Sequence, residues 1–399
     1  MEKQERSSFS SRVGFVLAAS GSAVGLGNLW RFPYLAARYG GGIFLLVYLI
    51  LVVTFGFSLM ITEFAIGRKT KLSCIGAYGA LDKRFNFLGW IAAFVPLIIT
   101  PYYCVIGGWV MYLWTFISGS ALEAADNGGF FSRFIGFDAG SLPATILNFS
   151  GPTPWFVLFV LITGLVVIFG VQKGIENASR LVLIVVIALY SLTIPGALAG
   201  VKYYLMPDFS QFSASTVLGA CGQMFYSMSL AMGITITYGS YMPKENLLEH
   251  SVTQIEIFDT LFAFFAGLMI IPAVIAFNGG DPSQVNSGPS LMFISLPMVF
   301  DSMKFGTIIG AVFFLLVLFA ALTSSIALME TLASVIMDKF KLKRIPATLI
   351  IIAICLVVGM LSCLGYGPWE SVTIIGMQFL DFFDFISNSV LMPIVAVLT

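Results

Sequence analysis

Charged residues are scarce in this sequence of 399 residues: Asp, Glu, Lys and Arg make up only 10%, against the about 25% usual in soluble proteins. The 20 acidic and 20 basic residues cancel, so the chain lacks the basic excess expected of a nucleic-acid-binding protein. Histidine occurs once, at His250, and the five cysteines show neither metal-site nor disulfide spacing. Its apolar segments contain no His/Glu metal motif and no Ser–His pair, which argues against an enzyme.

Long apolar runs dominate the rest of the chain. Hydrophobic residues make up 58% of it, and the mean hydropathy is +0.97. Runs such as FLLVYLILVVTFGFSLMI from Phe44 are long enough to cross a hydrocarbon core of ~30 Å. We therefore interpret the chain as an all-α integral membrane protein of one domain, residues 1–399. Ten spanning segments are expected at residues 12–37, 41–67, 87–118, 154–171, 177–200, 214–241, 253–279, 305–337, 346–366 and 369–398.

The positive charges indicate an orientation. With the N-terminus inside, fifteen of the 20 Lys and Arg lie in or beside cytoplasmic segments, and four lie outside, at Arg38, Arg133, Lys202 and Lys304. This bias predicts a cytoplasmic N-terminus. The plasma membrane is the expected location. The start MEKQERSSFSSR has no signal-peptide core and should be retained, while the apolar end LMPIVAVLT indicates a longer natural chain. The external stretch SGPSLMFISLPMVF predicts a short helix over the entrance.

Two of the segments contain residues that interrupt a membrane helix. The first includes GSAVGLGNLWRFP, with three glycines, Asn28 and the charged Arg31, and the sixth includes SMSLAMG, Ser227–Gly233. Carbonyl groups freed at such breaks suit a partly dehydrated cation, and the N-terminal end of the next half-helix suits a carboxylate. Close helix packing at the glycines is the alternative. Matching interruptions are typical of transporters with inverted repeats, here residues 12–200 and 214–398.

Four stretches carry a resemblance to a known family: GSAVGLGNLWRFPY, EFAIGR at Glu63–Arg68, GQMFYSMSLAMGITITYGSY at Gly222–Tyr241 and FAALTSSIALME at Phe319–Glu330. They resemble the neurotransmitter:sodium symporter family, and most of all its bacterial amino-acid transporters of the leucine-transporter type. The resemblance implies two inverted repeats of five transmembrane helices, with helices 1 and 6 unwound at mid-membrane. It also implies Na⁺-driven symport by alternating access, in which segments 1, 2, 6 and 7 rock against the remaining scaffold.

Two sodium sites are implied by the resemblance. The first would be formed by the Ala23 carbonyl, Asn28, Ser227, Asp259 and the carboxylate of the substrate. The second would be formed by the Gly21 and Val24 carbonyls with Ala320, Thr323 and Ser324. All of these can offer oxygen, the donor that hard cations prefer. For the LTSSI stretch the alternative is that its hydroxyl groups bond back to their own helix.

The substrate pocket implied by the resemblance draws on segments 1, 3, 6 and 8. It would be lined by Ala23, Leu26, Gly27, Ile99, Tyr103, Tyr226, Ser227, Ser229, Met232, Ser324 and Leu328. Tyr103 would hydrogen-bond the substrate carboxylate, and Tyr226 would form a lid. Gly25 stands where amine-transporting relatives have an aspartate, and the walls are apolar, so bulky aliphatic or aromatic L-amino acids are expected. Another small carboxylate-bearing solute is the alternative; a channel is disfavoured because the polar residues do not form a continuous path.

Two ion pairs are expected to gate the pathway. Outside, Arg31 would face Asp384, preferred for its distance from the helix end, with Asp381, one turn away, as the alternative. Inside, Arg6 would pair with Asp338, supported by Ser240 and Tyr241.

Two departures from the family pattern bear on mechanism. Relatives typically have asparagine where this chain has Asp259, so a fixed carboxylate would offset the sodium charge, and no chloride requirement is expected. The alternative is an acid that merely faces the cytoplasmic end of segment 7 beside Glu256. Relatives also have a proline ten residues after a glycine in segment 5, and this pair helps the helix to unwind. Here the residue ten positions after Gly174 is Ile184, so the proline is missing.

Overall fold

A computed structural model describes residues 12–124, 128–136, 151–169, 177–243, 247–281 and 290–399. Within these ranges the chain is helical and forms no strand beyond two isolated bridges. The α-helices are α1 Arg12–Ala23, α2 Phe32–Arg38, α3 Gly42–Leu51, α4 Phe57–Thr70, α5 Cys74–Leu81, α6 Asn86–Ala124, α7 Gly129–Ile135, α9 Pro152–Phe169, α10 Asn177–Ser191, α11 Ala197–Leu205, α12 Ala214–Ser227, α13 Ile234–Tyr241, α14 Leu248–Phe277, α15 Leu296–Ser302, α16 Gly306–Phe340, α17 Arg344–Gly365, α18 Phe379–Asp384 and α19 Met392–Leu398. Wider π-helical turns occur at Gly27–Arg31, Val52–Gly56, Leu291–Ser295 and Phe385–Leu391, and 3₁₀ turns at Lys83–Phe85 and Phe209–Gln211.

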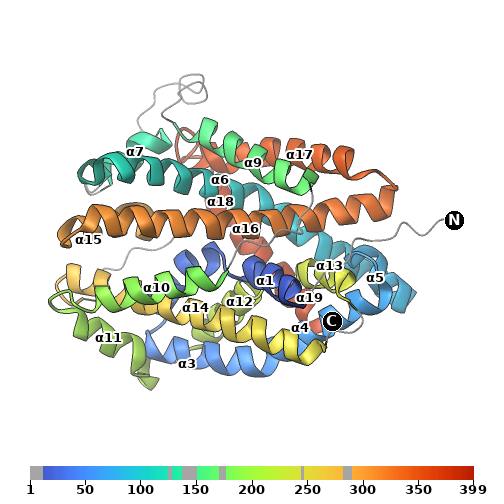
Figure 1. Ribbon diagram of the computed structural model, residues 1–399, viewed down its shortest axis with the longest axis horizontal. Coiled ribbons are helices and arrows are strands. Elements are labelled where there is room, and N and C mark those ends of the chain that lie inside the picture. Colours follow the sequence, from blue (N-terminus) through green and yellow to red (C-terminus); the bar gives the residue numbers. More distant parts are fainter. Residues whose placement is uncertain (1–11, 125–127, 137–150, 170–176, 244–246, 282–289) are drawn as a thin grey trace.

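The helices form two groups around the interrupted ones. Figure 1 shows α6, α9 and α17 along one side of the molecule, α16 through its middle, and α3 and α14 along the other side. Helix α16 packs against α6, α9 and α17, while α14 packs against α1, α2, α4, α10 and α11. The short helix α1 contacts both α14 and α16, so the first break lies between the two groups.

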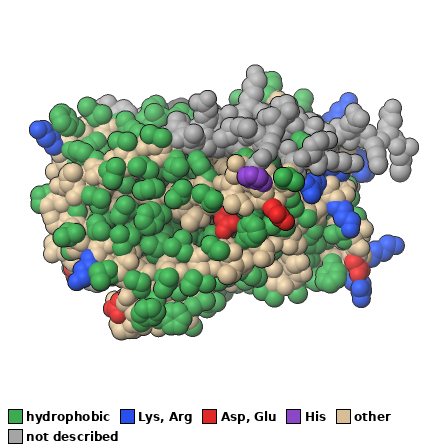
Figure 2. Space-filling view, turned by 60° about the horizontal axis from the view of Figure 1, so that its bottom comes forward, with side chains coloured by type: hydrophobic (Ala, Val, Ile, Leu, Met, Phe, Trp, Pro, Cys, Tyr) green, Lys and Arg blue, Asp and Glu red, His purple; other side chains and the backbone are tan. Residues whose placement is uncertain are grey.

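The surface is that of a membrane protein. In Figure 2 hydrophobic side chains cover most of the face shown, and lysine and arginine side chains lie towards its two ends. In the described ranges, seven helical stretches are long and apolar enough to cross a membrane: Gly42–Thr70, Lys83–Trp114, Pro152–Phe169, Leu248–Phe277, Gly306–Phe340, Arg344–Gly365 and Phe379–Leu398. Each falls on one of the ten expected segments.

The other three expected segments are shorter or divided in the described residues. The expected span 177–200 is wrong at its end: α10 stops at Ser191, and tighter turns continue to Ile194. Pro195 disfavours helix in the residue before it, and Gly196 adopts a φ of 89° before α11 begins. The expected start of the tenth segment at residue 369 is also wrong. Turns occupy the chain up to Gln378, including Ile375 and Gly376 at positive φ, and helix begins only at Phe379.

The first and sixth segments are interrupted where the sequence places their breaks. Helix α1 ends at Ala23, bends follow at Val24 and Gly25, and helical structure resumes afterwards. Helix α12 ends at Ser227 and α13 begins at Ile234. Between them Ser229 and Ala231 have φ values of 56° and 60°, which cost non-glycine residues about 1 kcal/mol each. The second break therefore needs tertiary contacts to hold it.

The EFAIGR motif allows α4 to approach α13 very closely. A Cβ atom on Gly67 would lie 1.9 Å from the carbonyl oxygen of Ile236, so only glycine fits there. The Lys71 ammonium donates to the Met242 carbonyl at 2.8 Å, beyond the end of α13. The predicted short helix in SGPSLMFISLPMVF is confirmed as the turn Leu291–Ser295 followed by α15, which packs on α6, α14 and α16.

Candidate functional site

Three side chains from three elements meet beside the two breaks. The Asn28 amide donates to Asp259 Oδ1 at 2.7 Å and to Ser227 Oγ at 3.0 Å, and Ser227 Oγ donates to Asp259 Oδ2 at 2.8 Å. Asn28 Oδ1 accepts the Gly25 N–H at 3.2 Å, so the same amide also ties down the first break. All three polar side chains are almost completely buried. The structure thus brings together the side chains expected for the first sodium site.

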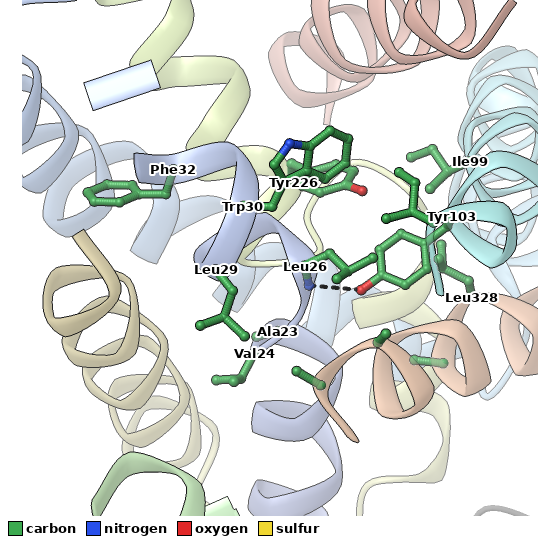
Figure 3. Close-up of a cluster of buried hydrophobic side chains, with 14 of the residues drawn as sticks. Ala23, Val24, Leu26, Leu29, Trp30, Phe32, Ile99, Tyr103, Tyr226 and Leu328 are labelled. Carbon is green, nitrogen blue, oxygen red and sulfur yellow. Dashed lines mark hydrogen bonds between the residues drawn. The ribbon is translucent and has the colours of Figure 1, made fainter. Parts of the chain in front are cut away.

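A small cavity lies next to this cluster, bounded by α6 and α16. In Figure 3 the side chains of Ile99, Tyr103 and Leu328 lie around the first break. Tyr103 Oη accepts the Leu26 N–H at 3.0 Å, the dashed contact in the figure. Tyr226 covers Gly27 so closely that a Cβ atom there would lie 2.7 Å from its ring. The break is therefore fixed from two sides by tyrosines.

The cavity volume is about 20 Å³, room for about one water molecule, so a bulky ligand requires the walls to move apart. Its lining comprises Ser22, Ala23, Gly25, Gly27, Ile99, Tyr103, Tyr226, Ser229, Met232, Ile234, Ser324 and Leu328. Leu26 and Ser227 were expected in the pocket but do not line this cavity: Leu26 turns its amide to Tyr103, and Ser227 its hydroxyl to Asp259. Ser22, Gly25 and Ile234 also line the cavity but were not predicted to do so. All three lie in the sequence stretches quoted around the two breaks, and this position could have indicated them.

The residues expected for the second sodium site are arranged differently. Thr323 Oγ1 donates to the carbonyls of Phe319 and Ala320 in its own helix, both at 3.1 Å. Ser324 Oγ reaches across to α1 and donates to the Ser22 carbonyl at 3.0 Å. Gly21 and Val24 are buried in α1 and its break, and α1 packs directly on α16. The two helices are thus adjacent, while the hydroxyl groups are hydrogen-bonded to backbone.

Arg31 lies in a buried polar network beyond Tyr226. Its Nε is 3.6 Å from Asp384 Oδ2, and its Nη1 donates to Gln223 Oε1 at 3.1 Å. Asp384 also accepts from Asn388 at 2.5 Å, whereas Asp381 accepts from Tyr366 at 2.9 Å. The arginine therefore faces Asp384, the first of the two acids proposed from the sequence. Sequence reasoning missed Gln223 and Asn388, although Gln223 lies in a quoted motif.

The opposite end of the pathway holds a second, tighter ion pair. Arg344 donates to Glu330 through two nitrogens at 2.5 and 3.0 Å, and Tyr241 Oη donates to Glu330 Oε1 at 3.0 Å. This network joins α13, α16 and α17 and was missed from the sequence, where Glu330 stood as an acid inside an apolar helix. Tyr241 also bonds Ser334, at 2.5 Å.

The predicted inner pair of Arg6 and Asp338 is only partly visible. Arg6 lies outside the described residues, so its position is not specified. Asp338 Oδ2 accepts the Ser73 N–H at 2.7 Å, and Ser240 Oγ donates to the Thr237 carbonyl at 2.6 Å within its own helix. Gly174, named in the comparison with segment 5 of relatives, also lies outside the described residues.

Glu63 is a further buried acid without a predicted role. It is 0% exposed and accepts the Ala231 N–H at 3.1 and 3.3 Å, as well as the Thr235 hydroxyl. These contacts hold the second break at the point where Ala231 has its unfavourable positive φ. The signal in the sequence was an acid within the apolar segment EFAIGR.

Comparisons with known proteins point to one family of membrane transporters. Residues 6–123 and 136–399 match the sequence model of the sodium:neurotransmitter symporter family. An uncharacterized sodium-dependent transporter of Bacillus subtilis is 36% identical over 98% of this chain and 86% of its own length. The sodium- and chloride-dependent GABA transporter 2 of Rattus norvegicus is 26% identical over 84% of this chain and 62% of its own. The crystal structure of MhsT in complex with L-phenylalanine has a TM-score of 0.89 and 38% identity, covering 98% of this chain and 88% of MhsT.

Proposed function

The chain belongs to the sodium:neurotransmitter symporter family, and from this membership we propose that it takes up hydrophobic L-amino acids together with Na⁺ by alternating access. It is a multi-pass membrane transporter and not an enzyme. The observation that carries the proposal is the meeting of Asn28, Ser227 and Asp259 where both breaks come together. The proposed location is the plasma membrane, with the N-terminus in the cytoplasm.

Sodium binding is supported by the chemistry of this cluster. A carboxylate, a hydroxyl and an amide supply the oxygen donors that a hard cation prefers, and a half-turn of the Asn28 amide would direct its oxygen inward. Na⁺ is a co-transported substrate in this proposal. We assign a first site to Asn28, Ser227, Asp259 and the Ala23 carbonyl. The second site, on Ala320, Thr323, Ser324 and the carbonyls of α1, requires Thr323 and Ser324 to leave their present backbone partners.

The substrate class is supported by the cavity walls. Ile99, Met232, Ile234 and Leu328 are apolar, and no lysine, arginine or acid is among the described residues that line it. Met232 is unbranched and adapts to different side-chain shapes. The substrate carboxylate would lie near the first sodium ion and Tyr103, and the apolar walls would contact the side chain. The phenylalanine in the MhsT crystal structure supports an amino acid of this kind.

Uptake into proteoliposomes tests the proposal. Radiolabelled leucine should accumulate when Na⁺ is outside and K⁺ inside, saturate with concentration, and fail when K⁺ replaces external Na⁺. Unlabelled phenylalanine and tryptophan should compete, whereas glutamate and lysine should not, because the cavity has no partner for a second charge. Equal competition by glutamate or lysine would overturn the substrate class, and flux that never saturates would favour a channel.

Replacing chloride by gluconate tests the role of Asp259 in the same vesicles. The carboxylate supplies a fixed negative charge beside the first sodium site, so uptake should continue at an unchanged rate in gluconate. Collapse of uptake would show that an external anion is still required.

A further inference from the structure

A second and much larger cavity lies at the end of the molecule where α4 and α16 end and α5 and α6 begin. Its volume is about 480 Å³, and Figure 1 shows α5 at this end, near the C-terminus. The described polar residues that line it are Ser73, Lys83, Asn86, Asp338, Lys339 and Lys341. Only Asp338 has a role in the transport pathway proposed above. The positive-inside bias predicts that this end faces the cytoplasm.

The charges of this cavity favour an anion. Among the described lining residues there are three lysines and one carboxylate, that of Asp338, which accepts the Ser73 N–H at 2.7 Å. The positive-inside bias alone would explain lysines spread over this end, but not a recess that gathers three of them. A phosphodiester carries one negative charge, so its binding would offset part of the positive charge of these lysines.

Ser73 provides an independent indication of a polar ligand. Its side chain is 0% exposed and lines the cavity, yet its Oγ has no hydrogen-bond partner. It precedes the first residue of α5, where a serine side chain usually caps the helix, but here it makes no capping bond. An unpaired buried hydroxyl costs about 1–3 kcal/mol. A ligand oxygen in the cavity would satisfy it.

The rim of the cavity distinguishes a lipid from a soluble anion. Trp90 is 46% exposed, and its ring centre lies 5.1 Å from Nζ of the lining residue Lys339. Phe87 and Phe340, 50% and 63% exposed, are next to the lining residues Asn86 and Lys339 in the sequence. Aromatic residues next to lysines are typical of the boundary between hydrocarbon and headgroups. A soluble phosphate would use the lysines alone, whereas a phospholipid would also cover the exposed rings with its acyl chains.

We propose that this cavity binds the phosphate headgroup of an anionic phospholipid from the membrane leaflet on this side. Lys83, Lys339 and Lys341 pair with the phosphodiester, Ser73 Oγ donates to one of its oxygens, and the acyl chains lie along Trp90 and Phe340. Because Asp338 lines the same cavity, the lipid lies next to the acid proposed for the inner gate. The binding proposal itself does not depend on the transported substrate.

Quenching of tryptophan fluorescence by brominated lipids tests this site in the purified full-length protein. Brominated phosphatidylglycerol should quench more strongly than brominated phosphatidylcholine at equal mole fraction, and Trp90→Phe should remove most of that difference. The double variant Lys339→Gln/Lys341→Gln should weaken the preference for phosphatidylglycerol about 30-fold, because each lysine near an anionic headgroup contributes about fivefold. The matched control is Lys69→Gln/Lys343→Gln, which removes two exposed lysines outside the lining and should keep the preference.

The remaining outcomes separate the sources of the anion. Inorganic phosphate at millimolar concentration should leave the quenching by phosphatidylglycerol unchanged; if it abolishes that quenching, the cavity is a site for free phosphate. Equal quenching by the two lipids in the unmodified protein would overturn the proposal without any variant. An equal loss of preference in both double variants would reduce it to general surface charge. Size-exclusion profiles that match the unmodified protein establish that each variant is folded.

Discussion

Asp259 and Glu63 are both fully buried, yet their partners differ in kind. Neither carboxylate pairs with a lysine or arginine in the described parts of the chain, and each lies against one of the two breaks. The partners of Asp259 are the side chains of Asn28 and Ser227, which themselves carry oxygen atoms. The partners of Glu63 are the Ala231 N–H and the Thr235 hydroxyl.

This difference separates an ion site from a structural contact. A hydroxyl and an amide can turn and present oxygen to a cation that binds Asp259. Of the two partners of Glu63, the Thr235 hydroxyl could also present an oxygen, but the Ala231 N–H can only donate, and it belongs to a residue held at an unfavourable φ. Burial of an unpaired acid is therefore not enough to indicate a cation site; the chemistry of its partners decides. Each of the following substitutions tests one side of this distinction.

The largest effect is expected for Asp259→Asn. Two unit charges about 4 Å apart attract by about 4 kcal/mol at an effective dielectric constant of 20, so loss of the carboxylate should weaken Na⁺ binding by about a hundred- to a thousandfold. Binding of ²²Na⁺ to purified protein measures this directly. Glu63→Gln is the matched control, because it also neutralises a fully buried acid, and it should leave Na⁺ affinity within a few-fold. Unchanged Na⁺ affinity in Asp259→Asn would show that Asp259 is not part of the sodium site.

The next effect is expected for Glu63→Ala, and it concerns stability more than ion affinity. Without the carboxylate, the Ala231 N–H and the Thr235 hydroxyl lose their acceptor, at about 1–3 kcal/mol for each group. The melting temperature in detergent should fall, and leucine affinity should fall with it, because Ser229 and Met232 belong to the same break. Glu63→Gln keeps one acceptor oxygen and should recover part of the loss. A Glu63→Ala protein as stable as the unmodified one would show that the break holds itself.

The breaks could be predicted because glycines and an amide stand out in an apolar segment, whereas the grouping of Asn28, Ser227 and Asp259 was implied only by the resemblance to the family. The sequence also predicted the preference for Asp384 over Asp381, through distance along the helix. It could not predict what Glu63 and Glu330 contact, since Ala231 lies 168 residues from Glu63 and the carboxylate gives no sign of which backbone it will meet. The end of α10 was not predicted because the apolar run continues past Ser191, and hydrophobicity alone does not show where the helix stops.

A third, smaller effect is expected at Glu330, an acid that does have an arginine. Glu330→Gln should break the two-nitrogen contact with Arg344 and weaken the bond from Tyr241. Because 26% of the Arg344 side chain is exposed, solvent limits the cost to about 1–2 kcal/mol, or about a tenfold rise in inward-open protein. Labelling of a cysteine introduced at Ala333, which is fully buried, by a cytoplasmic thiol reagent reports that population. Asp82→Asn, which disrupts an exposed pair with Arg84, serves as the control and should not change labelling.

The smallest effect is expected at the other end, where the ion pair is looser. Arg31 Nε lies 3.6 Å from Asp384, and the arginine keeps a second partner in Gln223, so Asp384→Asn removes only part of its stabilisation. A loss of about 0.5–1 kcal/mol should slow leucine uptake two- to fivefold while ²²Na⁺ affinity stays unchanged, because the Asp259 cluster is not disturbed. Asp381→Asn tests the alternative acid: it loses a bond to Tyr366 but none to Arg31, and uptake should remain near normal. If Asp381→Asn were instead the slower variant, the outer pair would form with Asp381 during transport. If Asp384→Asn weakened Na⁺ binding as much as Asp259→Asn does, the proposed division between ion-binding and gating acids would be wrong.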